Sequence, residues 1–453
     1  MYLLVADDLT GGNDAGIQFV KHGLETWLAL SPECAASGAS FIKPGAKPGA
    51  NACEGMPPTM FVVNTNTRNM PKDAAAKNVT DLVSALVGAS SAPHPEMVFK
   101  KIDSTLRGNL GAETDALMRE LSFEAAFLSP AFPAQERVVK NGLLYVNGVP
   151  VHETGFAKDP LTPISQSRVS DIVGSQSGRV IGEVPISIVE KGAEAIARAV
   201  AAMLRDGVEI FVFDAETAEH LAFIAAAGFM MRKKPLFIGS AGLAEALAQA
   251  MPGFGACRNA TDGTARQYAS KGIEHVLYVC GSAHQATRAQ VDALAKAGVP
   301  VVPFTGFLTG QSPEHERRAI VDALAAALRE GDVVLASPAA NGEHTAGNTL
   351  DGMALSDSIG EAALAAVKLS GLDAASLALV MTGGETAYAV LKEICTGLAL
   401  ERELFPGIAL CRVVGGEWDS LHVITKAGGF GDSETLVEVL RLLRPENVGG
   451  CRE

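Results

Sequence analysis

The sequence predicts an α/β protein of two domains, each built on a mostly parallel sheet flanked by helices, with a ligand cleft between them. Three observations support this prediction. The chain has 453 residues, which is too long for one comfortable hydrophobic core. Short apolar runs, the first at residues 2–6, alternate with helical patterns. The composition is 48% hydrophobic and 19% charged with 47 glycines, which is typical of α/β proteins rather than of disordered or fibrous chains.

The charge of the chain argues against a nucleic-acid binder. The formal net charge is −14 at pH 7 and no stripe of Lys and Arg is visible, whereas phosphate neutralisation needs a basic face. A small anionic ligand stays compatible, since a few local cations are enough to bind it. No run approaches the roughly 18 apolar residues that a membrane span needs, and the first residues lack the basic segment of a secretory signal. We therefore expect a cytoplasmic protein with neither a nucleic-acid nor a membrane partner.

Neither the cysteines nor the histidines predict a metal site. The seven cysteines are scattered and form no C-x-x-C pair, and the nine histidines show no H-E-x-x-H spacing. Free thiols in a reducing compartment fit this pattern better than a disulfide framework. The sequence therefore leaves the ligands of any metal unknown.

Polar residues follow the first predicted strand, residues 2–6. Asp7, Asp8 and Asp14 lie within a stretch of eight residues that also holds two glycines, and a helical pattern starts at residue 15. Carboxylates in such a loop suit hydroxyl binding, metal binding or proton abstraction, and glycines let a backbone approach a ligand closely. The alternative is that an acid merely caps the helix. Because three acids cannot all act as caps, we favour a functional site.

A second polar cluster occupies residues 100–109, between a predicted strand and a helix predicted over residues 113–121. In open α/β sheets ligands bind at such junctions, and the amino end of a helix favours an anion. Arg68, after the strand predicted at residues 59–63, would add a further cation, although a lone arginine is more often a solvated salt-bridge partner. We expect a carboxylate or phosphate ligand; the alternative is a surface turn of mutually paired charges. The ammonium, carboxylate, hydroxyl and guanidinium groups that could bind such a ligand belong to Lys101, Asp103, Ser104 and Arg107.

Three other segments bear on the domain organisation. Residues 31–58 are rich in Ala, Gly, Pro and Ser and predict a mobile surface insertion. The dipeptide Asn147-Gly148 between apolar runs predicts a β-hairpin. Small and polar residues predict a linker over residues 256–270. We therefore expect one domain over residues 1–255 and a second over residues 271–453.

Glycine-bearing turns follow three predicted strands of the second half. The turns lie at residues 281–284, 382–386 and 427–431. Glycines at the ends of parallel strands expose backbone amides that can bind phosphates. Neither a P-loop motif nor a G-x-G-x-x-G fingerprint is present, and each turn taken alone is more often an ordinary helix start. Three such turns in one domain favour a nucleotide or phosphate site.

Four motifs together, in this order, resemble the four-carbon acid sugar kinase family; they lie at residues 6–11, 101–109, 382–386 and 426–431. Residues 64–68 and 145–148 are similar as well, so the resemblance spans nearly the whole chain. It implies an acid-sugar-binding domain followed by a nucleotide-binding domain. It also implies ATP-dependent phosphorylation of a tetronate at its terminal hydroxyl. The insertion at residues 31–58 departs from the compact family pattern.

The resemblance also implies roles for individual residues. Around the carboxylate of the acid it implies Arg68, Lys101 and Arg107, and around the hydroxyls it implies Asp8, Asp14, Asp103 and Ser104. In the second domain it implies that ATP is bound by Ser282, Gly383, Gly384, Glu385, Thr386, Gly428 and Gly429. We expect Asp8 or Asp103 to accept the proton of the substrate hydroxyl, and Mg²⁺ to bridge the phosphates of ATP.

The expected substrate is D-threonate or D-erythronate. Residues 11–14 are closer to those kinases than to the 3-oxo-tetronate branch, in which phenylalanine more often replaces Leu9. The alternatives are a 3-oxo-tetronate 4-kinase and a sugar-acid-binding protein without catalysis. A sugar-acid isomerase or aldolase that works without nucleotide is a further rival. A homodimer is the default expectation for the assembly.

Overall fold

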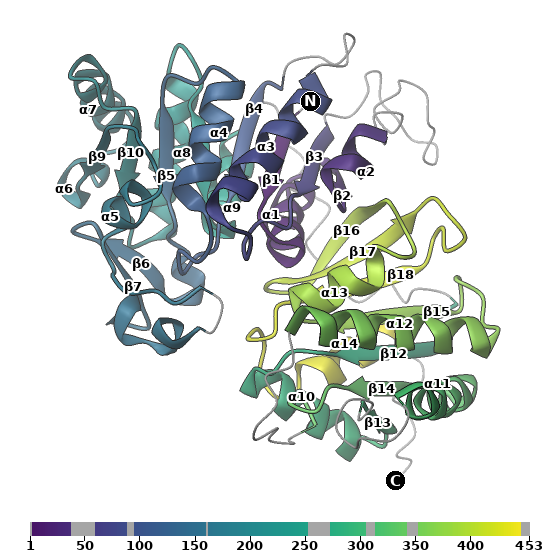
Figure 1. Cartoon of the computed structure of the whole chain (residues 1–453). Coiled ribbons are helices and arrows are strands. Elements are labelled where there is room, and N and C mark those ends of the chain that lie inside the picture. The colour runs from purple at the N-terminus through teal and green to yellow at the C-terminus, as the bar shows by residue number, and fades with distance from the viewer. Residues whose placement is uncertain are drawn as a thin grey trace. The chain divides into compact units, whose positions relative to one another are not determined.

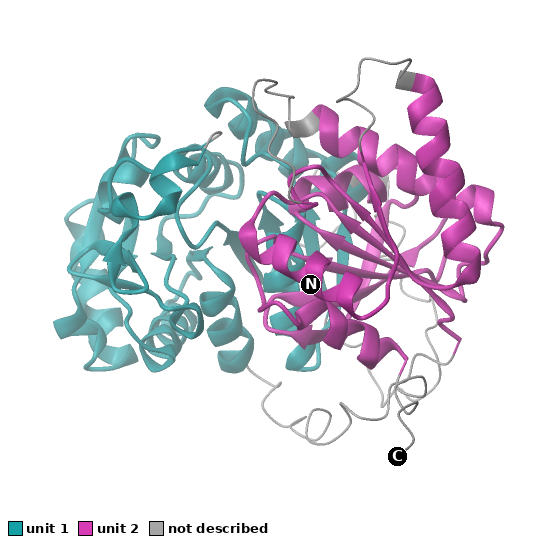
Figure 2. Ribbon diagram, turned by 90° about the horizontal axis from the view of Figure 1, so that it is seen from below, with its two compact units in different colours: residues 1–258 teal, residues 259–453 magenta. Residues whose placement is uncertain are grey.

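The computed structural model describes residues 2–37, 59–87, 95–159, 162–251, 272–304, 313–341 and 352–444. The chain divides into two compact units, residues 1–258 and 259–453 (Figure 2). The linker predicted over residues 256–270 lies outside the described residues, as does residue 38 onward of the predicted insertion. The insertion's first residues form a short helix, α2 (Pro32–Ser37), instead of a mobile segment, because the buried Ala35 packs this turn on its neighbours.

The first unit is built on a parallel sheet. All neighbouring pairs of its described strands run parallel, and the central strands are apolar and buried along their length, as expected when helices cover both faces. In spatial order the strands are β2 (Glu25–Ala29), β3 (Thr59–Asn64), β1 (Tyr2–Ala6), β4 (Met97–Lys101), β11 (Leu236–Gly239), β5 (Ala126–Ser129), β10 (Ile210–Phe213) and β9 (Ile181–Val184).

Helices cover both faces of this sheet (Figure 1). One face carries α1 (Leu9–Lys21), α9 (Ala241–Ala250), α8 (Ala218–Met230), α6 (Ile186–Val189) and α7 (Ala193–Arg205). The other carries α2, α3 (Lys72–Val87), α4 (Leu110–Glu120) and α5 (Val169–Gly174). Because α1 and α4 leave the neighbouring strands β1 and β4 toward opposite faces, the topological switch point lies at the carboxyl ends of these two strands. Ligands of open α/β sheets bind at such a point.

A small antiparallel sheet follows β5 in the chain. Its strands are β6 (Arg137–Lys140), β7 (Leu143–Val146) and β8 (Val149–Pro150). The predicted hairpin at Asn147-Gly148 is confirmed: both residues have positive φ, 50° and 76°, and join β7 to β8. Short 3₁₀ turns flank this sheet: η2 (Pro133–Gln135), η3 (Val151–Glu153) and η4 (Gly155–Lys158).

The second unit has a mixed sheet. Five neighbouring strands are parallel and the last two are antiparallel, a hairpin that was not predicted. In spatial order they are β13 (Val301–Pro303), β14 (Val333–Ala336), β12 (His275–Cys280), β15 (Leu377–Thr382), β18 (His422–Lys426), β17 (Ile408–Val414) and β16 (Gly397–Phe405). The helices are α10 (Gln285–Lys296), α11 (Pro313–Glu330), α12 (Gly352–Ser370), α13 (Gly384–Leu391) and α14 (Thr435–Leu443).

This sheet also has a switch point. Helices α10 and α14 pack against each other, whereas α11, α12 and α13 form a separate row. The neighbouring strands β12 and β15 are followed by α10 and α13, one from each group, so their carboxyl ends form the expected ligand position. The predicted two-unit α/β fold with mostly parallel sheets is therefore confirmed. Among the described residues, no helix is long and apolar enough to cross a membrane.

Candidate functional site

Helix α1 starts earlier than predicted, at Leu9, because Asp8 caps it. The Asp8 backbone is extended, and its Oδ1 accepts a hydrogen bond of 3.0 Å from the amide of Gly11 while Oδ2 accepts one of 2.7 Å from Thr10. The two glycines, predicted to open the backbone to a ligand, instead make room for protein atoms. A Cβ at Gly11 would overlap Asp8 Oδ1, and a Cβ at Gly12 would lie 3.0 Å from Leu28 on the sheet.

Arg68 is bound on two sides by carboxylates. Its Nε and Nη2 donate to the two oxygens of Asp7 at 3.0 and 2.8 Å, and Nη2 also donates to Asp8 Oδ1 at 2.6 Å. Burial opposes the charge of the Asp7 carboxylate, but Arg68 and Lys100 outweigh it and lower the pKa of Asp7. Arg68 thus ties the end of β3 to the end of β1, and its charge is matched within the protein.

Lys100 is also matched, by a carboxylate from α4. Its Nζ lies 2.5 Å from Oε2 of Glu113, and both side chains are fully buried. Burial raises the pKa of Glu113 despite the attraction of Lys100. The helix itself begins at Leu110 rather than at the predicted residue 113, so Glu113 lies in its first turn. This ion pair fixes α4 to β4 beneath the site.

The loop after β4 holds a third charged group. Asp103 Oδ2 accepts hydrogen bonds from Arg107 Nε at 2.7 Å and from Thr105 Oγ1. Arg107 Nη1 also donates to Asp159 at 3.0 Å, and its guanidinium lies 5.4 Å from the ring centre of Phe156. Burial opposes ionisation of Asp103, but Arg107 and Arg68 hold its pKa well below the usual range. Asp103 is therefore a fixed carboxylate with one oxygen, Oδ1, that accepts no bond from the described residues.

Lys101 and Arg137 differ from Arg68, Lys100 and Arg107 because neither makes an ion pair with a carboxylate of the described residues. Lys101 is 5% exposed and donates to the carbonyl of Ile102 at 2.9 Å. Arg137, from the start of β6, donates through Nη1 to Ser104 Oγ. Arg137 was not predicted as a site residue, since a single arginine after a proline-rich turn carries no local signal.

The structure brings the predicted first-domain residues into one cluster. Asp8 contacts Arg68, Asp103 contacts Arg107, and Lys101 Nζ lies next to Gly11, 3.0 Å from the position of a Cβ. Asp14, buried in α1, is near enough to Arg137 to act on its pKa. All seven lie around the carboxyl ends of β1, β3 and β4; they are Asp8, Asp14, Arg68, Lys101, Asp103, Ser104 and Arg107.

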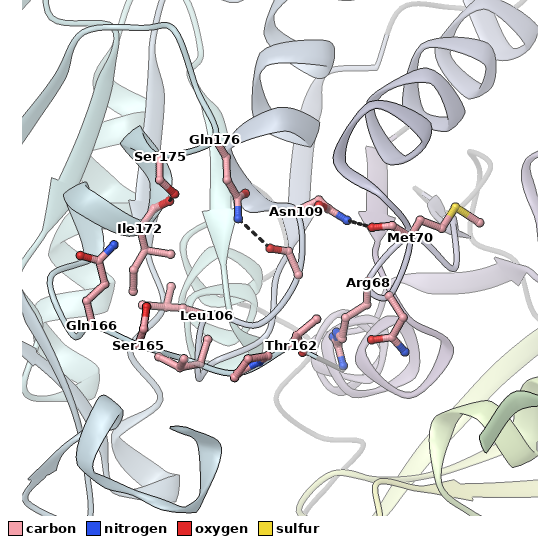
Figure 3. Close-up of a pocket in the computed structure, with 14 residues that line it drawn as sticks. Arg68, Met70, Leu106, Asn109, Thr162, Ser165, Gln166, Ile172, Ser175 and Gln176 are labelled. Atoms are coloured by element: carbon pink, nitrogen blue, oxygen red, sulfur yellow. Dashed lines mark hydrogen bonds between the residues drawn. The ribbon is translucent and has the colours of Figure 1, made fainter. Parts of the chain in front are cut away.

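A cavity of about 240 Å³ adjoins this cluster (Figure 3). Arg68 lines it, whereas the other predicted residues do not. Its remaining walls are uncharged: they come from residues 69–70 after β3, from the loop after β4, from residues 162–166, and from α5 and the two residues that follow it. Gln176 donates to the carbonyl of Gly108 at 3.0 Å, and Asn109 donates to the carbonyl of Met70 at 2.8 Å (Figure 3). These two bonds hold the loop after β4 against the residues that follow α5 and β3.

In the second unit the three glycine turns meet. A Cβ at Gly281 would overlap Thr386 Oγ1, and a Cβ at Gly428 would overlap Ser282 Oγ. Gly383 has φ 96°, a conformation that favours glycine, and its amide donates to the carbonyl of Lys426 at 2.9 Å. The structure thus brings together the turns after β12, β15 and β18. All seven predicted residues belong to them: Ser282, Gly383, Gly384, Glu385, Thr386, Gly428 and Gly429.

Lys426 holds the last of these turns in shape. Its Nζ donates to three carbonyl oxygens, of Ala427, Gly428 and Phe430, at 2.9, 3.2 and 3.0 Å. Burial lowers the pKa of Lys426 to about 8. Thr287 donates to the carbonyl of Gly428 from α10 at 2.9 Å. The sequence placed Lys426 in a motif but gave it no role, because its three acceptors appear only once the turn has folded.

The charged groups of the described residues do not form a metal centre. No set of three or more His, Cys, Asp or Glu side chains in the described ranges is arranged to hold a metal ion. In the cluster of the first unit, arginines and lysines instead engage Asp7, Asp8, Asp103 and Glu113.

Comparisons with known proteins agree with this division of the chain. Residues 2–247 match a family model described as a sugar-binding N-terminal domain, and residues 277–436 match one described as a nucleotide-binding C-terminal domain. A solved structure from Salmonella typhimurium, described as a putative tRNA synthase, has a TM-score of 0.72 and 23% sequence identity, covering 97% of this chain and 98% of its own. At that identity the likeness concerns the fold alone.

Three curated relatives span nearly the whole chain. A D-threonate kinase of Salmonella typhimurium is 35% identical and covers 97% of each chain. A D-erythronate kinase of Heliobacterium modesticaldum is 28% identical, covering 95% of this chain and 94% of its own. A 3-oxo-tetronate kinase of Methylobacterium radiotolerans is 29% identical, covering 97% and 98%.

Proposed function

Because the chain belongs to the four-carbon acid sugar kinase family, we propose that it transfers the γ-phosphoryl group of ATP to the C4 hydroxyl of D-threonate or D-erythronate. The observation that carries this proposal is the pairing of two different sites in one chain. One is a cluster of charged side chains at the switch point of the sugar-binding unit, and the other is a set of glycine turns at the switch point of the nucleotide-binding unit.

The charged cluster suits a hydroxylated acid. Carboxylates such as Asp103 and Asp14 can accept hydrogen bonds from hydroxyl groups, and Lys101 can meet an anionic end. Arg68 and Arg107 are already held by carboxylates of the protein, so we assign them to positioning Asp7, Asp8 and Asp103. Ser104 would offer a hydroxyl from the same loop.

Between the two predicted bases, the geometry favours Asp103. Both oxygens of Asp8 accept hydrogen bonds, from Gly11, Thr10 and Arg68, and the residue caps α1. Asp103 keeps Oδ1 for a substrate hydroxyl, and Arg107 holds the carboxylate in place through Oδ2. A strongly acidic aspartate orients the hydroxyl and takes its proton late in a loose phosphoryl-transfer transition state.

The second unit suits a triphosphate. The glycines let Ser282 and Thr386 pack closely against the neighbouring turns, and the first turn of α13, which begins at Gly384, can present backbone amides to phosphate oxygens. Lys426 supplies positive charge beneath the turn at Gly428. We propose that Mg²⁺ enters as part of the MgATP substrate, since this ion usually keeps several waters and is bound largely through phosphates.

A coupled assay of ADP release tests this function. Purified protein would be incubated with MgATP and, in turn, D-threonate, D-erythronate, their enantiomers and the 3-oxo-tetronates. We expect ADP with D-threonate or D-erythronate and a product phosphorylated at C4. ADP with 3-oxo-tetronates alone would support the alternative branch. Saturable binding of an acid without ADP formation would instead indicate a binding protein, and turnover without nucleotide an isomerase or aldolase.

A further inference from the structure

The charged cluster of the first unit is mostly self-neutralising. Asp7 and Asp8 match Arg68, Glu113 matches Lys100, and Asp103 and Asp159 match Arg107, as the ion pairs show. An anionic ligand is therefore not attracted by an overall positive charge. It must be recognised locally, by cations whose charge is not already matched by a carboxylate of the protein.

Arg137 is such a cation. Its Nη1 donates to a neutral acceptor, Ser104 Oγ, and its Nε is buried without a hydrogen-bond acceptor among the described residues. Its guanidinium lies over the ring of Phe156, and the distance from its central carbon to the ring centre is 6.0 Å. The guanidinium of Arg107 lies over the same ring. Burial lowers the pKa of Arg137, although Asp103 and Asp14 act against this. A partly buried guanidinium without a carboxylate partner is costly unless a ligand supplies one.

The fold fixes where Arg137 points. Before it come the η2 turn and Glu136, which caps that turn in a left-handed conformation with φ 52°. Two backbone hydrogen bonds then pair it with Phe132: the Phe132 amide donates to the Arg137 carbonyl at 2.7 Å and the Arg137 amide to the Phe132 carbonyl at 3.2 Å. On the other side β6 pairs with β7 at Val146. The side chain thus reaches the loop after β4 from a rigid support.

We propose that Arg137 binds the carboxylate of the sugar acid, together with Lys101, and that Arg68 and Arg107 do not contact it. A guanidinium presents two parallel N–H donors that match the two oxygens of a carboxylate. Ser104 and Phe156 orient that fork, and Lys101 adds a second positive charge at the end of β4. This inference rests on the proposed function for the identity of the acid but concerns binding alone.

Isothermal titration with D-threonate, in the absence of nucleotide, tests the assignment on the full-length protein. We expect Arg137→Gln to raise Kd about 10- to 100-fold, the range for a lost charge-assisted hydrogen bond. Arg137→Lys keeps the charge but lacks the two parallel donors, so its Kd should lie between those of the wild type and Arg137→Gln. The matched control is Arg179→Gln. Arg179 is likewise a partly buried arginine of the first unit, but it is ion-paired with Glu209 and precedes β9 at an edge of the sheet, so its removal should leave Kd unchanged.

A neutral analogue separates the carboxylate from other anions. D-Threitol lacks the carboxylate, so Arg137→Gln should leave its binding or turnover as in the wild type. An equal loss for D-threonate and D-threitol would overturn the assignment, since Arg137 would then serve the transferred phosphoryl group or the fold. An unchanged Kd for D-threonate in Arg137→Gln would overturn it as well. Binding of a non-hydrolysable ATP analogue, measured in parallel, should be the same in all variants.

The outcome is independent of the kinase proposal. If the wild type binds D-threonate but releases no ADP, the proposed reaction fails, while the effect of Arg137→Gln on Kd still decides this inference. If the wild type forms ADP and Arg137→Gln keeps a normal KM for the acid, the inference alone fails. If the wild type binds none of the four-carbon acids, both fail.

Discussion

The two candidate sites recognise anions by different means. In the first unit the site is made of charged side chains, most of them matched by a partner within the protein, as Arg68 is by Asp7. In the second unit it is made of closely packed backbone turns: a Cβ at Gly281 or Gly428 would overlap a neighbouring turn, and Gly383 has a positive φ that favours glycine. The first kind of site can discriminate between ligands by charge and hydroxyl pattern. The second provides a surface for phosphates that depends on the close fit of three turns.

Removing a matched cation should cost stability rather than specificity. In Arg68→Gln, Asp7 stays buried without its bidentate partner, and we expect a loss of about 3 kcal/mol in the free energy of unfolding. Urea unfolding monitored by circular dichroism would measure it. Lys77→Gln, which removes an exposed ion pair with Asp81, is the control and should cost well under about 1 kcal/mol. Equal stability of the two variants would contradict the view that the cluster holds itself together.

Removing the proposed base should affect turnover most. We expect Asp103→Asn to lower kcat about 100-fold, equivalent to about 2.7 kcal/mol, because the amide cannot take the hydroxyl proton. Asp159→Asn, which also removes a partner of Arg107, should have a much smaller effect on kcat. Steady-state ADP release would compare the two. If Asp103→Asn and Asp8→Asn both kept wild-type rates, neither aspartate would be the base.

The backbone site should be sensitive to a single methyl group. A Cβ at Gly428 would overlap Ser282 Oγ, so Gly428→Ala should separate two turns and raise KM for ATP about 10-fold, while KM for the acid stays the same. Gly331→Ala in the same unit is the control, because nothing lies within 4 Å of its Cβ position. A normal KM for ATP in Gly428→Ala would argue against this turn as part of the nucleotide site.

A smaller effect is expected from pH. The pKa of Lys426 is lowered to about 8 by burial, so its ammonium loses a proton as the pH rises through that value. One donor to the turn and one positive charge beneath it are then lost, and we expect KM for ATP to rise a few-fold between about pH 7 and pH 9. Lys426→Arg, which stays protonated, should remove this pH dependence even if its KM differs. A profile of the same shape in both proteins would contradict the assignment.

The same pKa has a consequence for stability. Between about pH 8 and the ordinary lysine value of 10.5 the unfolded chain binds a proton at Lys426 that the folded protein does not. The contribution of this group to the free energy of unfolding therefore rises with pH over that window. Deprotonation of Lys426 with rising pH thus has opposite effects on stability and on nucleotide binding, and this difference in sign allows the two effects to be distinguished experimentally.

Local patterns in the sequence were enough for the strands that carry the two sites, the turns that follow them and the hairpin at Asn147-Gly148, but not for the hairpin of β16 and β17. They placed both clusters at strand ends, and parallel pairing then brought those ends together. The start of α1 was wrong, because two glycines read as a loop, whereas the Asp8 cap and close packing on Leu28 make them helical. Such packing is a tertiary effect that overrides propensity.

Pairing between distant residues was beyond the sequence. Arg68 and Arg107 were predicted to bind the substrate, and only their contacts with Asp7, Asp8, Asp103 and Asp159 show that their charges are already matched. Arg137 was missed for the converse reason. Its contact with Ser104 spans 33 residues and arises from the position of β6 in a separate small sheet.

The conformation of Glu136 carries one more consequence. A side chain in the left-handed region costs about 1 kcal/mol relative to glycine, and the Glu136 side chain is exposed, so nothing in the fold obliges a charged residue to stand there. Glycine at this position would relax the backbone, but it would also give the turn more accessible conformations in both the unfolded and the folded protein. A rigid turn ahead of Arg137 and a relaxed backbone at position 136 are thus opposed requirements. Natural variation at position 136 should show which of the two prevails.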